Sequence, residues 1–506
     1  MTNVLVIVAD DMRYDHLPYL PNVRRLIQQP GRTFTGARCN VALCQPNRVG
    51  LLTGQLSRDH GELGIGYGAP VFEDHDNTLG AWAAAGGART GLLGKYVNYW
   101  DGPWPGGGIA APKGWDTWRQ LTTYQTAADW DVRKQTDPYR ITGVFQTDYL
   151  ADEARAFLDG SQPWFCLLTP QQPHSPFAPH PKDLHAWSHA RFRQVPVPDA
   201  TAKPDWVRNR FPLSDAEWSL LQQGFRGRLR ELTAVDRLVG EVVAHLEERE
   251  QLDDTVIVFS SDNGVHQGEQ RRSGDGTKAG PYDVGLRVPL LVRGPGVPPG
   301  PPVDAPSYPM QDINATVLAL TGGEAGLPHQ AGLDLRELLQ PEAHAQRTLL
   351  HEIGPEGFDA TGDGVTTGPR HELGYWKLFR YPSVRSKAPG PRSYELYDLA
   401  ADPDELVNLA DVPERRRVRD ALERELDGLL EACCGAACGS RPPTGPAWPR
   451  CGPASPAWWR RCGPTPAWPA SARATGARTG VAGAWCARWP GWPGAPTRSA
   501  PWCSTG

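Results

Sequence analysis

Two residues that could do chemistry, Cys44 and Arg48, lie close together in the stretch from residue 40 to residue 54, with Pro46 between them. Pro46 suits the first turn of a helix, where a missing N–H group loses no hydrogen bond. We therefore expect Cys44 at a helix N-terminus, where free N–H groups and the helix dipole favour negative charge. Arg48 lies four residues further on, on the same side of that helix. A nucleophile beside a fixed cation suits attack on an anionic ester, although a cysteine taken alone is more often a small buried hydrophobe.

Oxygen-bearing side chains follow two apolar runs that each predict a buried strand, at residues 3–9 and 255–261. These side chains are Asp10 and Asp11 after the first run, and Asp262 and Asn263 after the second. In an open α/β sheet, ligands bind beyond the carboxyl ends of the strands. Oxygen ligands without a thiolate select Ca²⁺ or Mg²⁺ over zinc. Either pair alone is also a turn signal, so the metal-site hypothesis depends on the two pairs meeting.

Three further side chains that could carry charge stand near predicted strand ends. Lys95 follows the strand predicted at residues 89–94, His174 follows a later strand, and Lys278 lies in a glycine-rich loop. Prolines on both sides hold His174 in a rigid, extended loop, and loops after strands often carry catalysis. The alternative for both lysines is an ordinary surface position, and for His174 it is a structural role.

Apolar patterns along the chain predict buried strands and helices. Buried strands are expected at residues 3–9, 89–94, 163–169 and 255–261, and helices at 21–27, 77–85, 146–158 and 227–246. From about residue 340 the predicted strands are shorter and carry aromatic residues. Residues 376–381 and 394–399 are expected to be antiparallel neighbours, followed by a helix at 412–430 with Asp411 as its N-cap.

The string Cys44-x-Pro46-x-Arg48, followed by Leu-Leu-Thr-Gly, resembles the signature of the type I sulfatases. The resemblance covers about residues 3–430, with the motifs in the family's order. It implies an alkaline-phosphatase-like α/β fold: a large, mostly parallel sheet sandwiched by helices, with a small C-terminal antiparallel-sheet subdomain. In that family the cysteine is oxidised to formylglycine, so a formylglycine-generating enzyme is an expected partner. Asn47 departs from the family pattern, in which Ser or Ala usually precedes the arginine.

The same resemblance implies roles for the candidate residues. Those that would hold a calcium ion, or a magnesium ion, are Asp10, Asp11, Cys44 as formylglycine, Asp262 and Asn263. Those that would act catalytically on the sulfate group are Cys44, Arg48, Lys95, His174 and Lys278. Those that would contact the substrate are Asn98 and His266. The Gly-Lys-Tyr-x-Asn form that ends at Asn98 is similar to a branch that includes heparan and glucosamine sulfatases, and Gln270 stands where a second histidine is often found.

The implied activity is hydrolysis of a sulfate ester to an alcohol and inorganic sulfate. One hydroxyl of the hydrated formylglycine would attack sulfur, and the second would expel sulfate and regenerate the aldehyde. The expected substrate is a sulfated small molecule or sugar. Two alternatives stay open. A phosphonate monoester or phosphodiester hydrolase of the same superfamily can use the same aldehyde, and a chain with unmodified Cys44 would be a non-catalytic, ligand-binding relative.

Composition narrows the class of protein further. The 506 residues carry a formal net charge of −5, which does not suggest nucleic-acid binding. No run approaches the roughly 18–20 apolar residues of a membrane span, and no signal peptide is recognisable. These features predict a cytoplasmic protein, with export left open if the start is misassigned. Cys39, Cys44 and Cys166 are too few for a disulfide framework in the part of the chain before residue 430.

The chain divides into three predicted parts. Residues 1–339 are expected to form the catalytic domain and residues 340–432 the C-terminal subdomain. Residues 433–506 form a tail rich in Trp, Pro, Arg and Cys, which from about residue 440 contains no Leu, Ile, Phe, Asp, Glu or Lys. Such a segment cannot build a core, so disorder is predicted. Its composition fits translation of a shifted reading frame, and the alternative is a tryptophan-rich interaction tail or membrane-surface segment.

Overall fold

The computed structural model describes residues 2–65, 72, 74–98, 110–122, 129–274, 277–354, 361–381 and 393–437. All of these lie in the first of two compact units, which runs from Met1 to Ala454. The second unit, Ser455–Gly506, lies outside the described residues, and with it most of the tail that was predicted to be disordered. The predicted boundary between residues 339 and 340 falls inside the first unit and stays a prediction.

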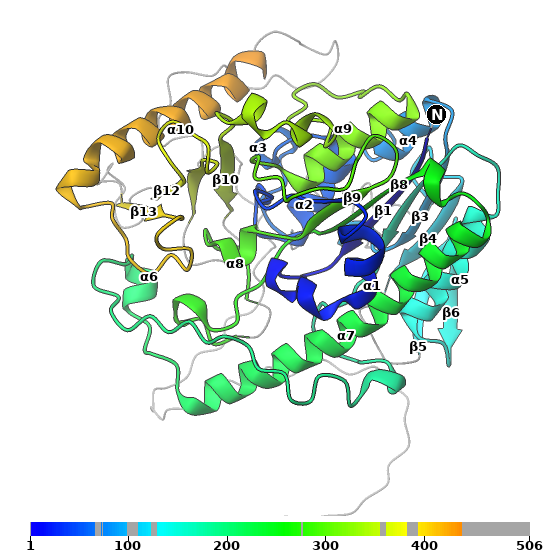
Figure 1. The fold of residues 1–506 in the computed structure, drawn as a ribbon, viewed down its shortest axis with the longest axis horizontal. Coiled ribbons are helices and arrows are strands. Elements are labelled where there is room, and N and C mark those ends of the chain that lie inside the picture. Colours follow the sequence, from blue (N-terminus) through cyan, green and yellow to red (C-terminus); the bar gives the residue numbers. More distant parts are fainter. Residues whose placement is uncertain are drawn as a thin grey trace, which may run out of the picture. The chain divides into compact units, whose positions relative to one another are not determined.

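Within the described residues, a nine-stranded sheet has the strand order β2-β9-β8-β1-β7-β3-β4-β5-β6 (Figure 1). Its strands are β1 (Asn3–Ala9), β2 (Arg32–Thr33), β3 (Arg89–Gly94), β4 (Thr117–Leu121), β5 (Asp129–Lys134), β6 (Asp137–Thr142), β7 (Trp164–Thr169), β8 (Thr255–Ser261) and β9 (Leu290–Arg293). The inner strands β8, β1, β7, β3 and β4 pair in parallel, and the pairs toward both edges are antiparallel. The prediction of a large, mostly parallel sheet is confirmed.

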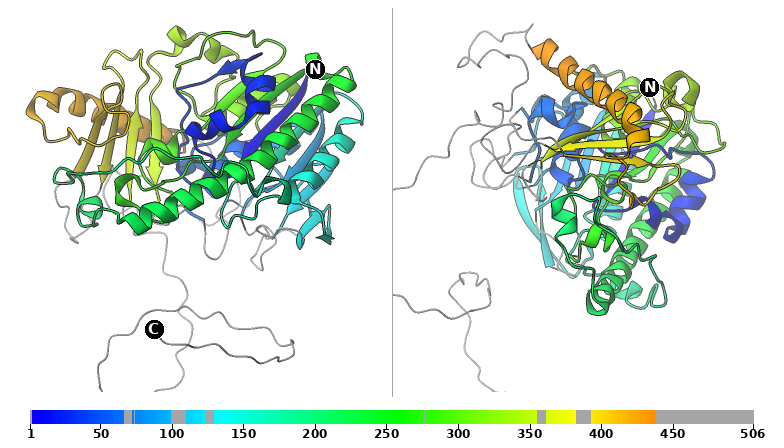
Figure 2. Two further views of the ribbon diagram at one scale, coloured as in Figure 1. Left: turned by 60° about the horizontal axis from the view of Figure 1, so that its bottom comes forward. Right: turned by 90° about the vertical axis from the view of Figure 1, so that its left-hand side faces the viewer.

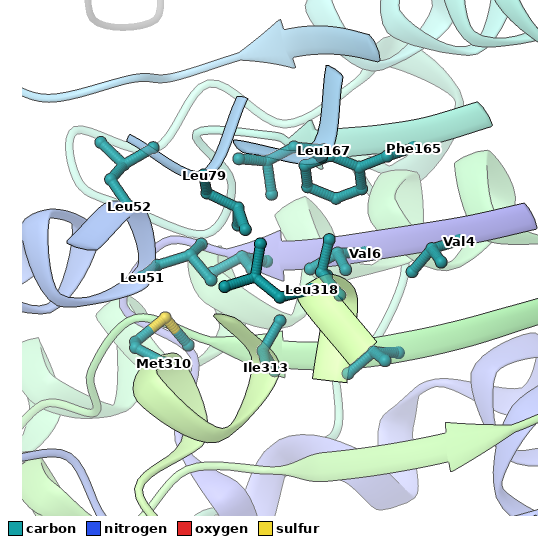
Figure 3. Close-up of a cluster of buried hydrophobic side chains, with 14 of the residues drawn as sticks. Val4, Val6, Leu51, Leu52, Leu79, Phe165, Leu167, Met310, Ile313 and Leu318 are labelled. Carbon is teal, nitrogen blue, oxygen red and sulfur yellow. The ribbon is translucent and has the colours of Figure 1, made fainter. Parts of the chain in front are cut away.

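Helices cover both faces of this sheet because β1 is apolar on both faces. The side chains of Val4, Val6 and Val8 pack toward α2 (Cys44–Thr53), α4 (Leu79–Ala85) and α9 (Pro309–Thr321). Figure 3 shows Val4 and Val6 facing Leu318 in this cluster. The alternate residues Leu5, Ile7 and Ala9 pack toward α5 (Gln146–Leu158) and α7 (Asp215–Glu248). The sheet is therefore sandwiched, as predicted.

Helix α7 is longer than the sequence pattern suggested. It begins at Asp215 instead of residue 227, because Ser214 and Glu217 form a capping box at its start. Four helices of the same part of the chain are short: α1 (Pro21–Val23), α3 (Ser57–His60), α6 (Asp205–Arg208) and α8 (Asp283–Leu286). Single helical turns lie at Tyr14–Tyr19, Arg24–Gln28, Pro181–Asp183, Leu252–Asp254, Glu269–Arg271, Glu337–Leu339, Pro341–His344 and Pro413–Arg415.

A second sheet is antiparallel throughout, in the order β10-β11-β12-β13. Its strands are β10 (Leu349–Ile353), β11 (Gly362–Thr366), β12 (Trp376–Tyr381) and β13 (Ser393–Asp398). Helix α10 (Arg416–Ala437) lies across this sheet (Figure 2, right). The predicted pairing of β12 with β13 is confirmed. The predicted N-cap is wrong: a tight turn at Pro413–Arg415 precedes α10, and Val412 precedes that turn without a side-chain cap.

Candidate active site

The two acidic strand ends meet because β1 and β8 are neighbours in register, with Ala9 opposite Ser261. The backbone N–H of Asp11 donates to Oδ1 of Asp262 over 3.1 Å. The side-chain amide of Asn263 donates to Oδ1 of Asp11 over 2.7 Å. These residues and Asp10 are at most 1% exposed. The structure therefore gathers the four predicted oxygen donors at one place beyond the sheet.

Cys44 is the first residue of α2, as the sequence predicted, and its side chain is buried. The side-chain amide nitrogen of Asn98 lies 3.4 Å from Sγ of Cys44. The backbone N–H of Asn98 donates to Oε1 of Gln45 over 2.7 Å, which fixes Asn98 against the start of the helix. The cysteine thus lies in a polar environment at the positive end of the helix dipole.

Lys278 connects the cysteine with the acidic residues. Its Nζ lies 2.6 Å from Oδ1 of Asp11 and 3.7 Å from Sγ of Cys44. The next backbone N–H, of Ala279, donates to the carbonyl of Ala42 over 2.7 Å, so the lysine loop is attached to the segment before α2. A cation in this position faces both the candidate nucleophile and the candidate metal ligands.

Lys95 and Arg48 supply positive charge to Asp10 and Asp262. The backbone of Lys95 is fixed to Thr169 by hydrogen bonds of 2.8 and 2.7 Å, and its Nζ donates to Oδ2 of Asp10 over 2.5 Å. Nε of Arg48 donates to Oδ2 of Asp262 over 2.8 Å, and Nη1 donates to the carbonyl of Lys95 over 3.0 Å. The prediction that the end of β3 faces the same place as the ends of β1 and β8 is therefore correct.

His174 points one ring nitrogen at the site. Its Nδ1 contacts the carbonyl of Ser175, so Nδ1 carries a proton, because a carbonyl can only accept. Nε2 lies 3.6 Å from Oδ2 of Asp11. Burial lowers the pKa of His174, while Asp11 and Asp10 oppose that change. A proton exchanged with a bound molecule would therefore be held at Nε2.

Burial and opposite charges act strongly on the acidic residues. Burial would raise the pKa of Asp10, but Lys95 and Arg48 lower it well below its usual value. Burial raises the pKa of Asp262 to about 7, and the neighbouring Asp10 carboxylate adds to this rise. Burial alone would lower the pKa of Lys278, but Asp11 raises it well above its usual value. Groups of both signs are thus held together away from water, as at many catalytic sites.

The donor atoms fit a hard divalent cation, which the sulfatase resemblance implies. Oδ1 of Asp10 and Oδ1 of Asn263 are buried and accept no hydrogen bond from the described residues. Buried oxygens normally have partners, so these two are suited to coordinate an ion. Ligand atoms of Asp10, Asp11 and His174 also lie within 4.8 Å of one another. A cation there would lower the pKa of the adjacent carboxyl groups.

His266 is buried beside the loop that carries Lys278. Its ring packs edge-on against Tyr282, with centroids 6.0 Å apart, and its backbone N–H donates to the carbonyl of Thr277. Among the described residues, no hydrogen bond or ion pair joins it to Cys44 or to the acidic residues. His180 is buried, with Nε2 3.1 Å from Oδ2 of Asp148. No local pattern around His180 indicates this burial.

Asn47 supports the site in a way that its identity did not reveal. Its side-chain amide nitrogen lies 2.5 Å from the carbonyl of Val41, 3.1 Å from that of Leu43 and 2.7 Å from that of Asp262. These contacts fix the start of α2 to the end of β8. Asn47, which departs from the family pattern, therefore has a structural role in this chain. In the sequence, only its position between Pro46 and Arg48 could have indicated that role.

The chain is similar to known proteins over most of its length. A model of the family described as Sulfatase matches residues 2–323. Human N-acetylglucosamine-6-sulfatase is 27% identical over 484 residues, which span 86% of this chain and 85% of the relative. A structure solved with its substrate D-glucosamine-2-N,6-O-disulfate is 20% identical and has a TM-score of 0.68, covering 85% of this chain and 98% of that one. The phosphonate monoester hydrolase of Agrobacterium radiobacter is also 20% identical, with a TM-score of 0.65 over 86% and 96% of the two chains.

The solved structures establish the alkaline-phosphatase-like fold, and the family match establishes the chemical class. No helix in the described part of the chain combines the length and apolarity needed to cross a membrane. The family implies a divalent metal ion and formylglycine, and the buried acidic cluster and Cys44 are placed to provide both. The chain belongs to the sulfatase family and is a sulfuric ester hydrolase.

Proposed function

We propose that this enzyme removes a sulfate group from a sulfated sugar, using formylglycine made from Cys44 and a calcium ion. The observation that carries the proposal is the position of Lys278, whose Nζ lies 3.7 Å from Sγ of Cys44 and 2.6 Å from Asp11. Sugar as the substrate class is supported by the names of relatives that act on, or were solved with, glucosamine sulfates. The Gly-Lys-Tyr-x-Asn form at residues 94–98 supports the same class.

The residues of the chain bind and polarise the sulfate group. Lys95 and Arg48 present buried positive charge, and Lys278 adds a charge that is only 11% exposed. These charges stabilise the negative charge that moves toward the leaving oxygen. Their positions are fixed by hydrogen bonds and ion pairs before substrate arrives, so little reorganisation is needed. We assign Asn98 to the substrate as well, because its side chain lies 3.4 Å from Sγ of Cys44. His266 would reach the substrate from beside Tyr282.

His174 is assigned to proton transfer. Its ring is oriented by the contact of Nδ1 with the carbonyl of Ser175, so Nε2 is the atom that exchanges a proton with the substrate. Burial lowers the pKa of His174, which makes the neutral ring the resting form at neutral pH. The neutral ring accepts a proton from an attacking hydroxyl and, once charged, is able to return it to a leaving oxygen.

The cofactors are assigned to residues whose chemistry fits them. Asp10, Asp11, Asp262 and Asn263 would hold the ion, and an all-oxygen set favours Ca²⁺, with Mg²⁺ second. A bound ion would supply Lewis acidity at the sulfate oxygens. Formylglycine would supply, in its hydrated form, the attacking hydroxyl. Its formation from Cys44 needs a formylglycine-generating enzyme, which is the proposed protein partner.

The proposal is tested by turnover of matched substrates. Protein made together with a formylglycine-generating enzyme would be given N-acetylglucosamine 6-sulfate, an aryl sulfate and the corresponding aryl phosphonate monoester. We expect the highest kcat/KM for the sugar sulfate and no turnover by a Cys44→Ala control. A higher kcat/KM for the phosphonate would instead identify a phosphonate hydrolase. Absence of turnover with all three, in protein shown to carry the aldehyde, would contradict the proposal.

A further inference from the structure

Glu405 lies in the turn after β13, within the string Asp402-Pro-Asp-Glu405-x-x-Asn408, to which the mechanism gives no role. The turn is firmly held. Asp402 accepts hydrogen bonds from the backbone N–H groups of Leu406 and Val407, and Oδ1 of Asn408 accepts one from Leu396 of β13. Glu405 itself has a left-handed backbone, with φ of 54°. A residue other than glycine is strained in this conformation, and it keeps the conformation only where its surroundings hold it there.

The carboxylate of Glu405 is buried and binds the segment 277–286, which carries Lys278. Its Oε2 accepts the backbone N–H of Asp283 over 2.6 Å, and its Oε1 lies 2.8 Å from Nζ of Lys377 on β12. Lys377 also pairs with the Asp283 side chain, which accepts two further hydrogen bonds from Arg38. Asp283 is thus held by the small sheet on one side and by the segment leading to Cys44 on the other.

The backbone carbonyl of Glu405 contacts a second segment near the active site, the loop that follows β8. It accepts a hydrogen bond from the side chain of Gln270 over 3.1 Å and another from Nζ of Lys203. Gln270 belongs to the loop that follows Asp262 and Asn263, and it too has a left-handed backbone. One residue of the C-terminal part of the chain therefore touches both loops that extend from the candidate metal and sulfate site.

A contact of Tyr282 anchors the same segment 277–286. The hydroxyl of Tyr282 donates to Oε2 of Glu395 on β13 over 2.8 Å. Tyr282 precedes Asp283 and lies four residues after Lys278, in a segment whose backbone is otherwise attached to Ala42 through Ala279. Two consecutive side chains of this segment thus end on carboxylates or cations of the small sheet.

We propose that Glu405 is a positioning residue through which the C-terminal sheet sets the place of Lys278 in the active site. This inference rests on the proposed function for the role of Lys278, but the anchoring itself does not. When the Glu405 carboxylate is replaced by a neutral amide, its bond to the Asp283 N–H loses its charge assistance and the ion pair with Lys377 is lost. The segment 277–286 then has more freedom, and Nζ of Lys278 spends less time at Asp11.

The first test measures anchoring without any turnover. Hydrogen–deuterium exchange of the full chain would be compared for wild type, Glu405→Gln and Glu352→Gln. Glu352 is a matched control, a buried glutamate of β10 that pairs with Arg58 and, among the contacts of the described residues, with neither loop. We expect amides of segment 277–286 to exchange about 10- to 100-fold faster in Glu405→Gln alone, with β1 unchanged. Equal exchange in wild type and variant, or a rise that includes β1, would overturn the proposal.

The second test separates positioning from general stability. In a double-mutant cycle with Lys278→Met, Glu405→Gln is expected to lower kcat/KM about 10- to 100-fold when Lys278 is present and to have little further effect when it is absent. If the fold-losses in kcat/KM of the two single variants multiply in the double variant, the proposal is overturned. Tyr282→Phe removes a single hydroxyl from the same segment and replaces Glu405→Gln if that variant does not fold. If wild type has no sulfatase activity, the exchange measurement still decides the anchoring.

Discussion

Nζ of Lys278 donates to Oδ1 of Asp11 over 2.6 Å, although the two residues are separated by most of the catalytic part of the chain. The contact brings the glycine-rich loop onto the end of β1. It also leaves Nζ within 3.7 Å of Sγ of Cys44. This lysine therefore joins the nucleophile position to the acidic cluster.

Replacing Lys278 with methionine keeps much of the side-chain volume and removes the charge. We expect kcat/KM for a sulfate ester to fall about 100- to 1,000-fold, because the transition state loses one fixed cation. Steady-state kinetics on protein with a measured aldehyde content would check this. Lys113→Met is the control, since Lys113 is 79% exposed and pairs only with an exposed aspartate among the described contacts. Equal kcat/KM values for the two variants would contradict the role given to Lys278.

Asn47→Ala removes an amide that reaches three backbone carbonyls, including that of Asp262. Buried acceptors that lose their donor are costly, so the free energy of unfolding should fall by about 1–3 kcal/mol. Urea unfolding would measure the change, with exposed Asn209→Ala as the control. Asn47 would have no supporting role if both variants were as stable as wild type.

Removal of divalent ions should destabilise the enzyme. An ion that binds only the folded state adds about 2.7 kcal/mol at a concentration one hundred times its Kd. We therefore expect Tm to fall on treatment with a chelator and to recover with Ca²⁺, less fully with Mg²⁺, and least with Zn²⁺. Asp10→Asn should abolish the recovery, because it removes a carboxylate that lies in the buried cluster. A Tm that does not change with any of the three ions would exclude the proposed ion site.

His351, a buried residue of β10, makes the stability of the protein depend on pH. Its ring lies 2.9 Å from both the carbonyl of Cys39 and the hydroxyl of Thr366, and burial, with Lys377 adding to it, lowers its pKa to about 3. The unfolded chain takes up a proton near pH 6.5, so this stabilisation is full above that pH and is lost as pH falls toward 3.

His351→Gln should therefore flatten the fall in stability between pH 6 and pH 4 by about 1.4 kcal/mol per pH unit. Urea unfolding across this range, with exposed His185→Gln as the reference, would measure the slope. Identical slopes in the two variants would mean that His351 does not carry this dependence.

The sequence was sufficient to predict the centre of the site because parallel strands place their carboxyl ends at one edge. Asp10 and Asp262 each follow a continuous apolar run, and the two runs became adjacent strands in matching register. Cys44 was placed correctly because proline and the apolar residues after it indicate a helix start. These are local signals, and the rule that joins them is general.

Other features depend on contacts that no local pattern carries. Strand β6 is almost wholly exposed and has no apolar alternation, so it could not be recognised as part of the sheet. The first turns of α7 are largely exposed, so the helix was predicted to start too late, although Ser214 and Glu217 signal a cap. The role of Glu405 depends on Asp283 and Gln270, which are distant in the sequence, and on a backbone conformation that is unusual for glutamate.

Mass spectrometry of the peptide that contains Cys44, from protein made together with an active formylglycine-generating enzyme, tests the account most directly. The account predicts that the residue at position 44 carries an aldehyde in place of the thiol, despite Asn47 in the motif. A peptide that retains only the thiol under these conditions would contradict it and would leave the chain a ligand-binding relative of the sulfatases.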